Sequence, residues 1–237
     1  MVEIPPQTNE VHRAAPILAG LNYCLSRYPM PVMLSELGAS AGFNLLLDRY
    51  TLNAGRALQS VEDSIITLSP EWMGAIPPQQ PLKIFDRAGV DINPLNPIDR
   101  LDYLRLLSYT WADQCDRLDR IKHIAPHQTT KVEQADAADW LPNQLSKQRN
   151  GTLHFVFHTI ALQYFPQESK DKIAYALAQA GDRATPERPL GYMSMEISDD
   201  LEGAKLTLQL WPGGQVQDVG RADFHGRWVS WGSSHIG

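Results

Sequence analysis

The residues best suited to chemistry lie in one short segment, 36–44, which reads Glu-Leu-Gly-Ala-Ser-Ala-Gly-Phe-Asn. Its two glycines, at 38 and 42, allow a tight turn and a close approach of the backbone to a ligand. An apolar run precedes the segment at 32–37, and apolar residues follow it at helical spacing. The pattern therefore predicts a buried strand, a turn and a helix. In a doubly wound α/β domain such a turn binds a nucleotide-like cofactor.

Three functions are compatible with this turn. The dinucleotide fingerprint G-x-G-x-x-G is broken by Ser40 and Gly42. The sequence also reads G-x-S-x-G, the nucleophile elbow of serine hydrolases, with Ser40 followed by an acid such as Asp199 and a histidine such as His225. Such hydrolases need several strands before the elbow, which disfavours this second function. The third pattern is the E-x-G-x-x-x-G loop of class I S-adenosylmethionine methyltransferases, with Glu36 ending the strand.

The order of the other segments predicts an α/β fold. We expect helices over about 16–28, 97–124 and 169–179, and strands over 65–68, 87–94, 132–137, 153–157, 190–197, 205–210 and 227–231. Strands that alternate with helices, followed by strands without helices, predict a mainly parallel sheet with an antiparallel C-terminal edge. We expect one domain over 1–237, with an N-terminal arm and helix over 1–30 and an insertion over about 51–81.

Composition restricts the class of partner. The net charge of −6 argues against a general nucleic-acid binder, which needs a basic face. The sequence contains neither an apolar run of transmembrane length nor a signal peptide. Cys24 and Cys115 lie far apart, which is typical of two reduced thiols in a cytoplasmic protein. We expect a cytoplasmic protein that acts on a small molecule, with no membrane or nucleic-acid partner and no metal.

Further motifs carry a resemblance to a known family. They are Pro5-Pro6-Gln7-Thr8-Asn9-Glu10-Val11, the 36–42 segment, Asp91-Ile92-Asn93-Pro94-Leu95, Ala135-Asp136-Ala137-Ala138-Asp139-Trp140, Phe157-His158-Thr159, Gln163-Tyr164 and Trp211-Pro212-Gly213-Gly214. With them the chain resembles the bacterial domain-of-unknown-function family 2332. Members usually carry a further segment before Pro5, so the resemblance implies a shorter homologue or a fragment.

The order of elements also resembles the class I methyltransferase fold, which implies a Rossmann-like three-layer α/β/α domain. Its mainly parallel seven-stranded sheet has an antiparallel C-terminal strand.

The methyltransferase resemblance implies S-adenosylmethionine as cofactor. Glu36 would face the amino group of its methionine part, Asp91 would accept both ribose hydroxyls, and Asp136 would accept the adenine amino group. The cofactor-binding residues predicted in this way are Glu36, Gly38, Ser40, Gly42, Asn44, Asp91, Asn93, Asp136 and Ala137. The two aspartates also have a simpler interpretation, as caps of the turn or helix that follows each of them.

His158 is the candidate catalytic residue, because it ends an apolar strand and its unperturbed pKa, near 6.5, suits proton abstraction from a methyl acceptor. The alternative is a histidine satisfied within the core. The predicted substrate pocket consists of Gln7, Asn9, Gln163, Tyr164 and Glu196, in which the N-terminal arm folds over the cofactor site. We therefore expect a methyltransferase for a small-molecule acceptor. The alternative is a methyltransferase-like domain that binds a cofactor or partner without turnover.

Overall fold

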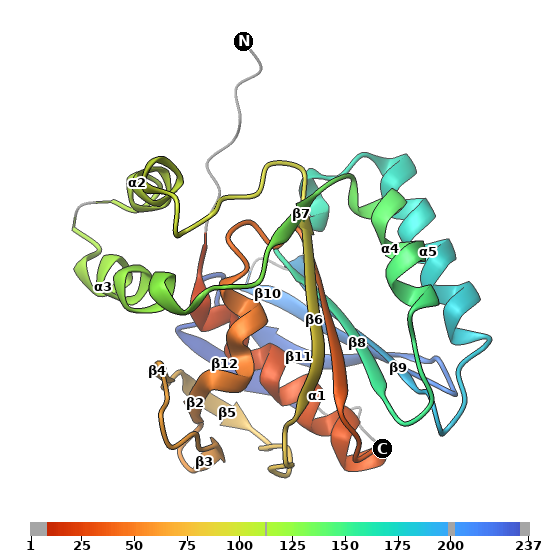
Figure 1. The fold of residues 1–237 in the computed structure, drawn as a ribbon. Helices are drawn as coiled ribbons and strands as arrows, with labels where there is room; N and C mark the ends of the chain where they lie inside the picture. The colour runs from red at the N-terminus through yellow and green to blue at the C-terminus, as the bar shows by residue number, and fades with distance from the viewer. Residues whose placement is uncertain (1–8, 112, 199–201, 233–237) are drawn as a thin grey trace.

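The computed structural model of the chain describes residues 9–111, 113–198 and 202–232. A nine-stranded sheet forms its centre, in the order β5-β12-β11-β10-β9-β8-β1-β6-β7 (Figure 1). The strands are β1 (Val32–Leu37), β5 (Glu71–Gly74), β6 (Ile84–Asp91), β7 (Val132–Gln134), β8 (Leu153–Thr159), β9 (Leu190–Ile197), β10 (Ala204–Trp211), β11 (Val216–Ala222) and β12 (Trp228–Trp231). The predicted α/β class with a mostly parallel large sheet is confirmed.

The half of the sheet that carries β1 is parallel. Strands β7, β6, β1, β8 and β9 all run in the same direction, with β1 between β6 and β8. All six residues of β1 are buried, as expected for a strand covered on both faces. The connection from β1 leads to β6 on one side, and the later strand β8 pairs on its other side. The strand order therefore reverses at β1.

The other half of the sheet is largely an antiparallel meander. Strands β9, β10, β11 and β12 pair antiparallel in sequence order, and β5 adds to β12 in parallel. The predicted count of seven strands is therefore wrong. β11 was missed because it contains Asp218, Gly220 and Arg221 and lacks clean alternation. β5 comes from the predicted insertion, and no local pattern indicates its distant partner.

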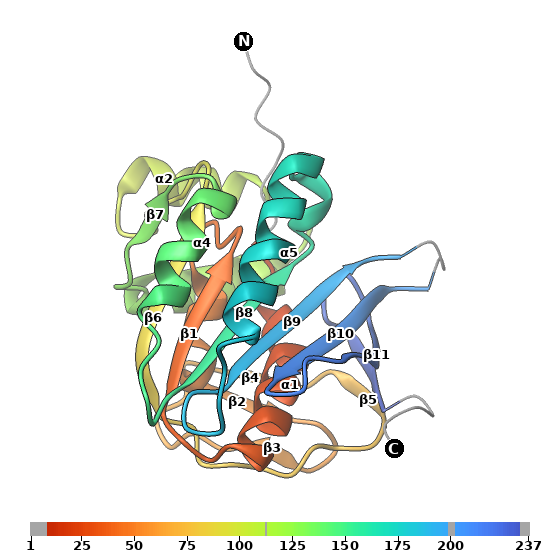
Figure 2. The same ribbon diagram turned by 90° about the vertical axis from the view of Figure 1, so that its right-hand side faces the viewer.

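Helices cover both faces of the sheet. α1 (Ala14–Arg27) packs on one face against Phe155 and Met193. α4 (Ala137–Ser146) and α5 (Gln167–Gly181) lie side by side on the opposite face, over Leu37 and Val156 (Figure 2). Because successive strand residues point to opposite faces, neighbouring residues such as Phe155 and Val156 enter different core clusters.

Three predicted segments differ from the structure. The expected helix 97–124 is two helices, α2 (Arg100–Ser108) and α3 (Cys115–Ile124), followed by the 3₁₀ turn η3 (Ala125–His127). The helix after the 36–44 segment is a kinked 3₁₀ helix, η2 (Phe43–Arg49), because Leu46 departs from helical geometry. The insertion holds four strands: β2 (Tyr50–Asn53), β3 (Ala57–Gln59) and β4 (Ile66–Leu68) form a small sheet, and β5 joins the large one.

Two further 3₁₀ helices, η1 (Val11–Arg13) and η4 (Leu162–Tyr164), precede α1 and α5. Across the part of the chain that the structure describes, every helix is too short or too polar to cross a membrane.

Candidate functional site

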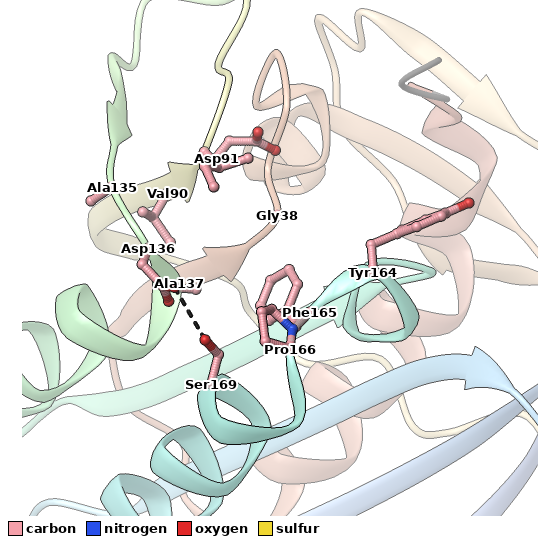
Figure 3. A pocket seen from close by; sticks show the side chains of 11 residues that line it. Gly38, Val90, Asp91, Ala135, Asp136, Ala137, Tyr164, Phe165, Pro166 and Ser169 are labelled. Carbon is pink, nitrogen blue, oxygen red and sulfur yellow. Dashed lines mark hydrogen bonds between the residues drawn. The ribbon is translucent and has the colours of Figure 1, made fainter. Parts of the chain in front are cut away.

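A cavity of about 120 Å³ opens at the carboxyl ends of the parallel strands, next to the point where their order reverses (Figure 3). This is the position at which open α/β sheets bind ligands. Its lining comes from the ends of β1, β6 and β7, from the segment between β8 and α5, and from the first turns of α4 and α5: Gly38, Val90, Asp91, Ile92, Ala135, Asp136, Ala137, Tyr164, Phe165, Pro166 and Ser169. The sequence motifs at 36–42, 91–95 and 135–140 therefore meet, as predicted.

The loop after β1 has a strained, well-anchored backbone. Gly38, Ser40 and Gly42 all have positive φ, with Ser40 at 50°. The side chain of Asn9 donates from Nδ2 to Ser40 Oγ at 2.9 Å and accepts from the Ala41 N–H at 3.2 Å. Asn9 was predicted to line the substrate pocket. Instead it fastens the segment before η1 to this loop.

Asp91 ends β6, as predicted for a ribose-binding acid. Its Oδ2 accepts the Ser40 N–H at 2.8 Å, and its Oδ1 accepts the Asn93 N–H at 2.8 Å. The capping interpretation of Asp91 thus describes the observed contacts. Asp91 also lines the cavity.

Asp136, at the end of β7, likewise accepts one hydrogen bond on each of its carboxylate oxygens. It caps α4 by accepting the Ala138 N–H at 2.7 Å, and Ser169 donates to its other oxygen at 3.1 Å (Figure 3). The capping alternative is observed here as well. Asp136 and the adjacent Ala137 nevertheless line the cavity.

The segment after β8 forms the opposite wall. Ile160 has φ of 50°, which is a rare conformation for a β-branched residue. Tyr164 lines the cavity while 67% exposed, whereas Gln163 is exposed and is not part of the lining. A Cβ on Gly38 would lie 2.6 Å from the Cβ of Ala161, so the loops after β1 and β8 touch.

Glu36 and Asn44 lie behind the β1 loop, outside the cavity lining. Asn44 Nδ2 donates to Glu36 Oε1 at 3.3 Å, and the buried Glu36 Oε2 has no hydrogen-bond partner among the described residues. Burial raises the pKa of Glu36 to about 8, against the lowering effect of the Asn44 hydrogen bond. The carboxyl group is therefore largely protonated at neutral pH and has an unused oxygen.

His158, the predicted catalytic base, is 0% exposed and is absent from the cavity lining. Its Nδ1 lies 2.6 Å from Glu196 Oε1, and its Nε2 lies 2.7 Å from the Tyr192 hydroxyl. Both ring nitrogens are thus engaged, which is the arrangement of a satisfied core histidine.

Glu196 was predicted to line the substrate pocket, but it has a different position. Its Oε1 also accepts the N–H groups of Ala161 and Leu162, at 2.9 and 3.0 Å, so it fixes the segment after β8. Burial favours the neutral carboxyl group, but the hydrogen bonds from His158 and the two N–H groups outweigh it and lower the pKa of Glu196.

The residues of the hydrolase hypothesis are not brought together by the described chain. His225 lines a different cavity from the one beside the β1 loop. Asp199, the suggested acid, and Gln7, a predicted pocket residue, lie outside the described residues.

Comparison with known families agrees with the motifs. Residues 1–231 match the sequence model of a family described as "Uncharacterized protein conserved in bacteria (DUF2332)". The chain belongs to the DUF2332 family. None of the curated proteins matches it. The DUF2332 match therefore covers the whole nine-stranded sheet and every strand end around the cavity.

The sequence missed several site residues of this DUF2332 chain. Phe165, Pro166 and Ser169 line the cavity although no motif included them. Ser169 lies in the first turn of α5, and the helix predicted over 169–179 was the one local signal for it. Tyr192 was missed because its partner, His158, lies 34 residues away in sequence.

A pair of glycine variants tests how tightly the DUF2332 site is packed. Gly38→Ala should lower the free energy of unfolding by about 1 kcal/mol more than Gly55→Ala. Both glycines have positive φ, 70° and 81°, so both alanines have the same backbone strain, about 1 kcal/mol. Only the Cβ at 38 meets another atom, since nothing lies within 4 Å of the Cβ position at 55. Equal losses in urea denaturation would show that the two loops separate freely.

Proposed function

We propose that this DUF2332 protein is an S-adenosylmethionine-dependent methyltransferase for a small-molecule acceptor, and that the cavity receives the nucleoside part of the cofactor. The observation that carries the proposal is the position of two carboxylates, Asp91 and Asp136, beside an apolar cavity at the ends of adjacent strands. Val90, Ile92 and Phe165 offer apolar surface to a flat base. The carboxylates supply acceptors for a diol and for an amino group.

The topology supports a nucleoside site. The parallel half has the strand order β7-β6-β1-β8-β9. If these five strands are numbered 1 to 5 along the chain, the order reads 3-2-1-4-5, which is the order of doubly wound nucleotide-binding sheets. The cavity lies at the carboxyl edge of this half, where the reversal of order separates the loops. The meander β10–β12 differs from the expected seven-stranded pattern, but it lies beyond β9, away from these strand ends.

Backbone strain supports a binding role for the same loops. Ser40 and Ile160 are the two non-glycine residues with positive φ in the described chain, and they follow the neighbouring strands β1 and β8. Such conformations cost about 1–3 kcal/mol each and gather at ligand-binding sites, where packing and hydrogen bonds enforce them. Here Asp91 and Asn9 hold Ser40, and Glu196 holds the residues after Ile160.

The size of the cavity and the polar groups near it indicate which residues would contact each part of the cofactor. The cavity of about 120 Å³ is smaller than the usual small-molecule site of about 300–1,000 Å³, so it suits the nucleoside part alone. The Gly38–Gly42 loop would carry the methionine part, and Glu36, with its unpartnered Oε2, would accept a hydrogen bond from the ammonium group. The bound cofactor would supply a sulfonium methyl group for direct displacement.

A second function is favoured by one observation. His158 is enclosed by Glu196 and Tyr192, so the predicted proton acceptor does not line the cavity. A domain that binds the same cofactor without turnover would need no such base. Methyl transfer to an acceptor that is already nucleophilic would not need one either.

Calorimetry with an aspartate variant tests the nucleoside site. S-adenosylmethionine and S-adenosylhomocysteine should bind with micromolar Kd, about −8 kcal/mol, and 5′-methylthioadenosine should also bind. Asp136→Ser should weaken all three by about tenfold, because serine still caps α4 but lacks the second oxygen. Asp99→Ser is the matched control, since Asp99 caps α2 away from the cavity.

The outcomes separate the candidates. Absence of heat and of a thermal shift with all three ligands contradicts a nucleoside site. Binding of S-adenosylmethionine without transfer of its labelled methyl group to any component of a metabolite extract favours the non-catalytic domain.

A further inference from the structure

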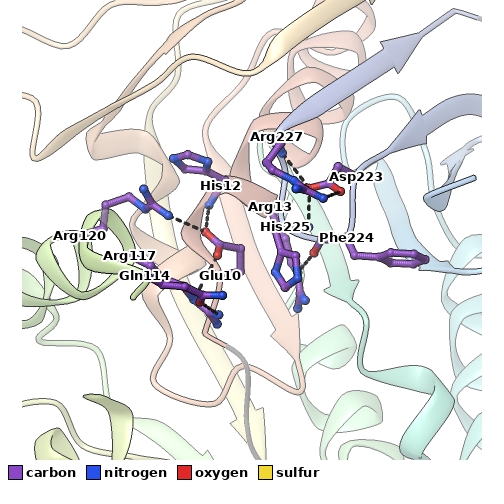
Figure 4. Close-up of polar contacts among 10 residues, drawn as sticks. All are labelled: Glu10, His12, Arg13, Gln114, Arg117, Arg120, Asp223, Phe224, His225 and Arg227. Carbon is purple, nitrogen blue, oxygen red and sulfur yellow. Dashed lines mark hydrogen bonds and ion pairs between the residues drawn. The ribbon is translucent and has the colours of Figure 1, made fainter. Parts of the chain in front are cut away.

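A second and larger cavity, of about 410 Å³, lies between the segment before α1, the start of α3 and the turn 223–227 (Figure 4). It is separate from the nucleoside cavity, since the two share no lining residue. Its volume falls within the range of about 300–1,000 Å³ that is usual for small-molecule sites.

The inner wall of this cavity contains a cluster of arginines around one carboxylate. Glu10 is 3% exposed; its Oε2 lies 3.2 Å from Arg117 Nε, and its Oε1 lies 3.6 Å from an Nη of Arg120. Arg117 is itself 8% exposed. Among the described residues, neither Arg117 Nε nor Arg120 Nε has a hydrogen-bond partner of good geometry. Two guanidinium groups therefore share one carboxylate, and Arg117 also donates from Nη1 to Gln114 Oε1 at 3.1 Å.

Two more arginines add positive charge nearby. Arg13 is buried, and its Nε donates to the Phe224 carbonyl at 2.8 Å. Arg227 lines the cavity and binds Asp223 through two hydrogen bonds of 2.8 Å. The cluster thus contains four arginines and two carboxylates, Glu10 and Asp223.

Among the described residues that line the cavity, the other acids are Asp113 and Asp116, and both are exposed at its rim. Water screens such exposed charges, whereas Arg117 and Arg120 share the single buried carboxylate of Glu10, so one positive charge there has no counter-charge of its own. An anion in the cavity would balance the inner cations without displacing any of their present partners.

Two histidines also line the cavity, of which His12 is half-buried and His225 is exposed. Burial lowers the pKa of His12 and of His225, and the neighbouring arginines lower both values further, although Glu10 opposes the change. Both rings are thus neutral at neutral pH and have N–H donors without adding a fixed charge.

We propose that this cavity binds the phosphate group of a small molecule. Guanidinium groups reach it both from α3, through Arg117 and Arg120, and from the turn 223–227, through Arg227. Arginines that approach from two elements suit a group with several oxygens, because each guanidinium can donate two parallel hydrogen bonds. The inference stands independently of the proposed methyl transfer.

Titration with inorganic pyrophosphate tests this site. We expect saturable binding in calorimetry that weakens as the salt concentration rises, and about tenfold weaker binding in Arg120→Gln. Lys122→Gln is the matched control, because it removes an exposed positive charge from the same helix, where Lys122 pairs with Asp119. It should bind like the wild type. Citrate is the comparison ligand, and binding of citrate as tight as that of pyrophosphate would overturn the choice of phosphate.

A second variant distinguishes a loss of the site from a folding defect, because it is expected to bind more tightly than the wild type. Asp116→Asn removes a negative charge from the rim without touching an arginine, so it should tighten pyrophosphate binding about twofold to threefold. Asp136→Ser should leave pyrophosphate binding unchanged, which distinguishes this site from the nucleoside cavity. Absence of pyrophosphate binding by the wild type, or equal binding by Arg120→Gln and Lys122→Gln, overturns the proposal.

Discussion

Replacing Glu196 with alanine is expected to lower the free energy of unfolding by about 3–5 kcal/mol. The half-buried carboxylate accepts three hydrogen bonds, from His158 Nδ1 and from the N–H groups of Ala161 and Leu162. Without it, all three donors lose their acceptor, and the fully buried His158 keeps only Tyr192 as a partner. Urea denaturation followed by tryptophan fluorescence measures the loss.

Two further variants control this experiment. Glu196→Gln retains one oxygen as an acceptor and should lose much less stability than the alanine variant. Glu62→Ala removes an exposed carboxylate from a loop and should change the free energy of unfolding by no more than about 0.5 kcal/mol. A loss below about 1 kcal/mol in Glu196→Ala would mean that the His158–Glu196 contact contributes little. His158 would then be available for another role, including proton transfer.

Glu36→Gln should gain stability relative to the wild type as the pH rises. The pKa of Glu36 is about 8 in the folded protein, mainly because the side chain is buried, and about 4.3 in an unfolded chain. At a pH between these two pKa values the folded state binds more protons than the unfolded state. The contribution of Glu36 to the free energy of unfolding is therefore greatest below the unfolded pKa and is lost as the pH rises through 8.

Between pH 5 and pH 9 we expect the wild type to lose about 2–4 kcal/mol relative to Glu36→Gln, whose amide does not titrate. The free energy of unfolding of both proteins, measured by urea denaturation across this range, gives the difference directly. Parallel pH profiles for the two proteins would rule out a raised pKa for Glu36. Glu36 would then be ionised in the core at neutral pH, which requires a cationic partner.

The contacts of Glu196 and Asp91 indicate how the site is built. Glu196 fixes the segment after β8, Asp91 fixes the loop after β1, and these two loops touch at Gly38 and Ala161. The cavity walls are therefore held by carboxylates that already have backbone partners. In the proposed function these backbone contacts also favour binding, because a ligand meets loops that are already in place.

Several features were determined by the sequence alone. The apolar runs of β1 and β8 predicted buried strands, because a parallel strand covered on both faces consists mostly of apolar residues. Gly38 and Gly42 predicted the turn, because its positive φ values favour glycine. The motifs at Asp91 and Asp136 predicted strand ends around one cavity, and the family followed from the motifs together. All of these signals are local in the chain.

Other features were decided only by the tertiary structure. β5 joins β12 although more than 150 residues separate them, and the exposed, mixed pattern of β5 carries no sign of that partner. The placement of His158 depends on Glu196, 38 residues away, and on Tyr192; the sequence could offer only a polar residue at a strand end. Periodicity fixes which side of a strand or helix is apolar. The partner of a buried polar group depends on which distant segments pack together. The arginine cluster around Glu10 depends on the same packing, because its members come from three separate parts of the chain.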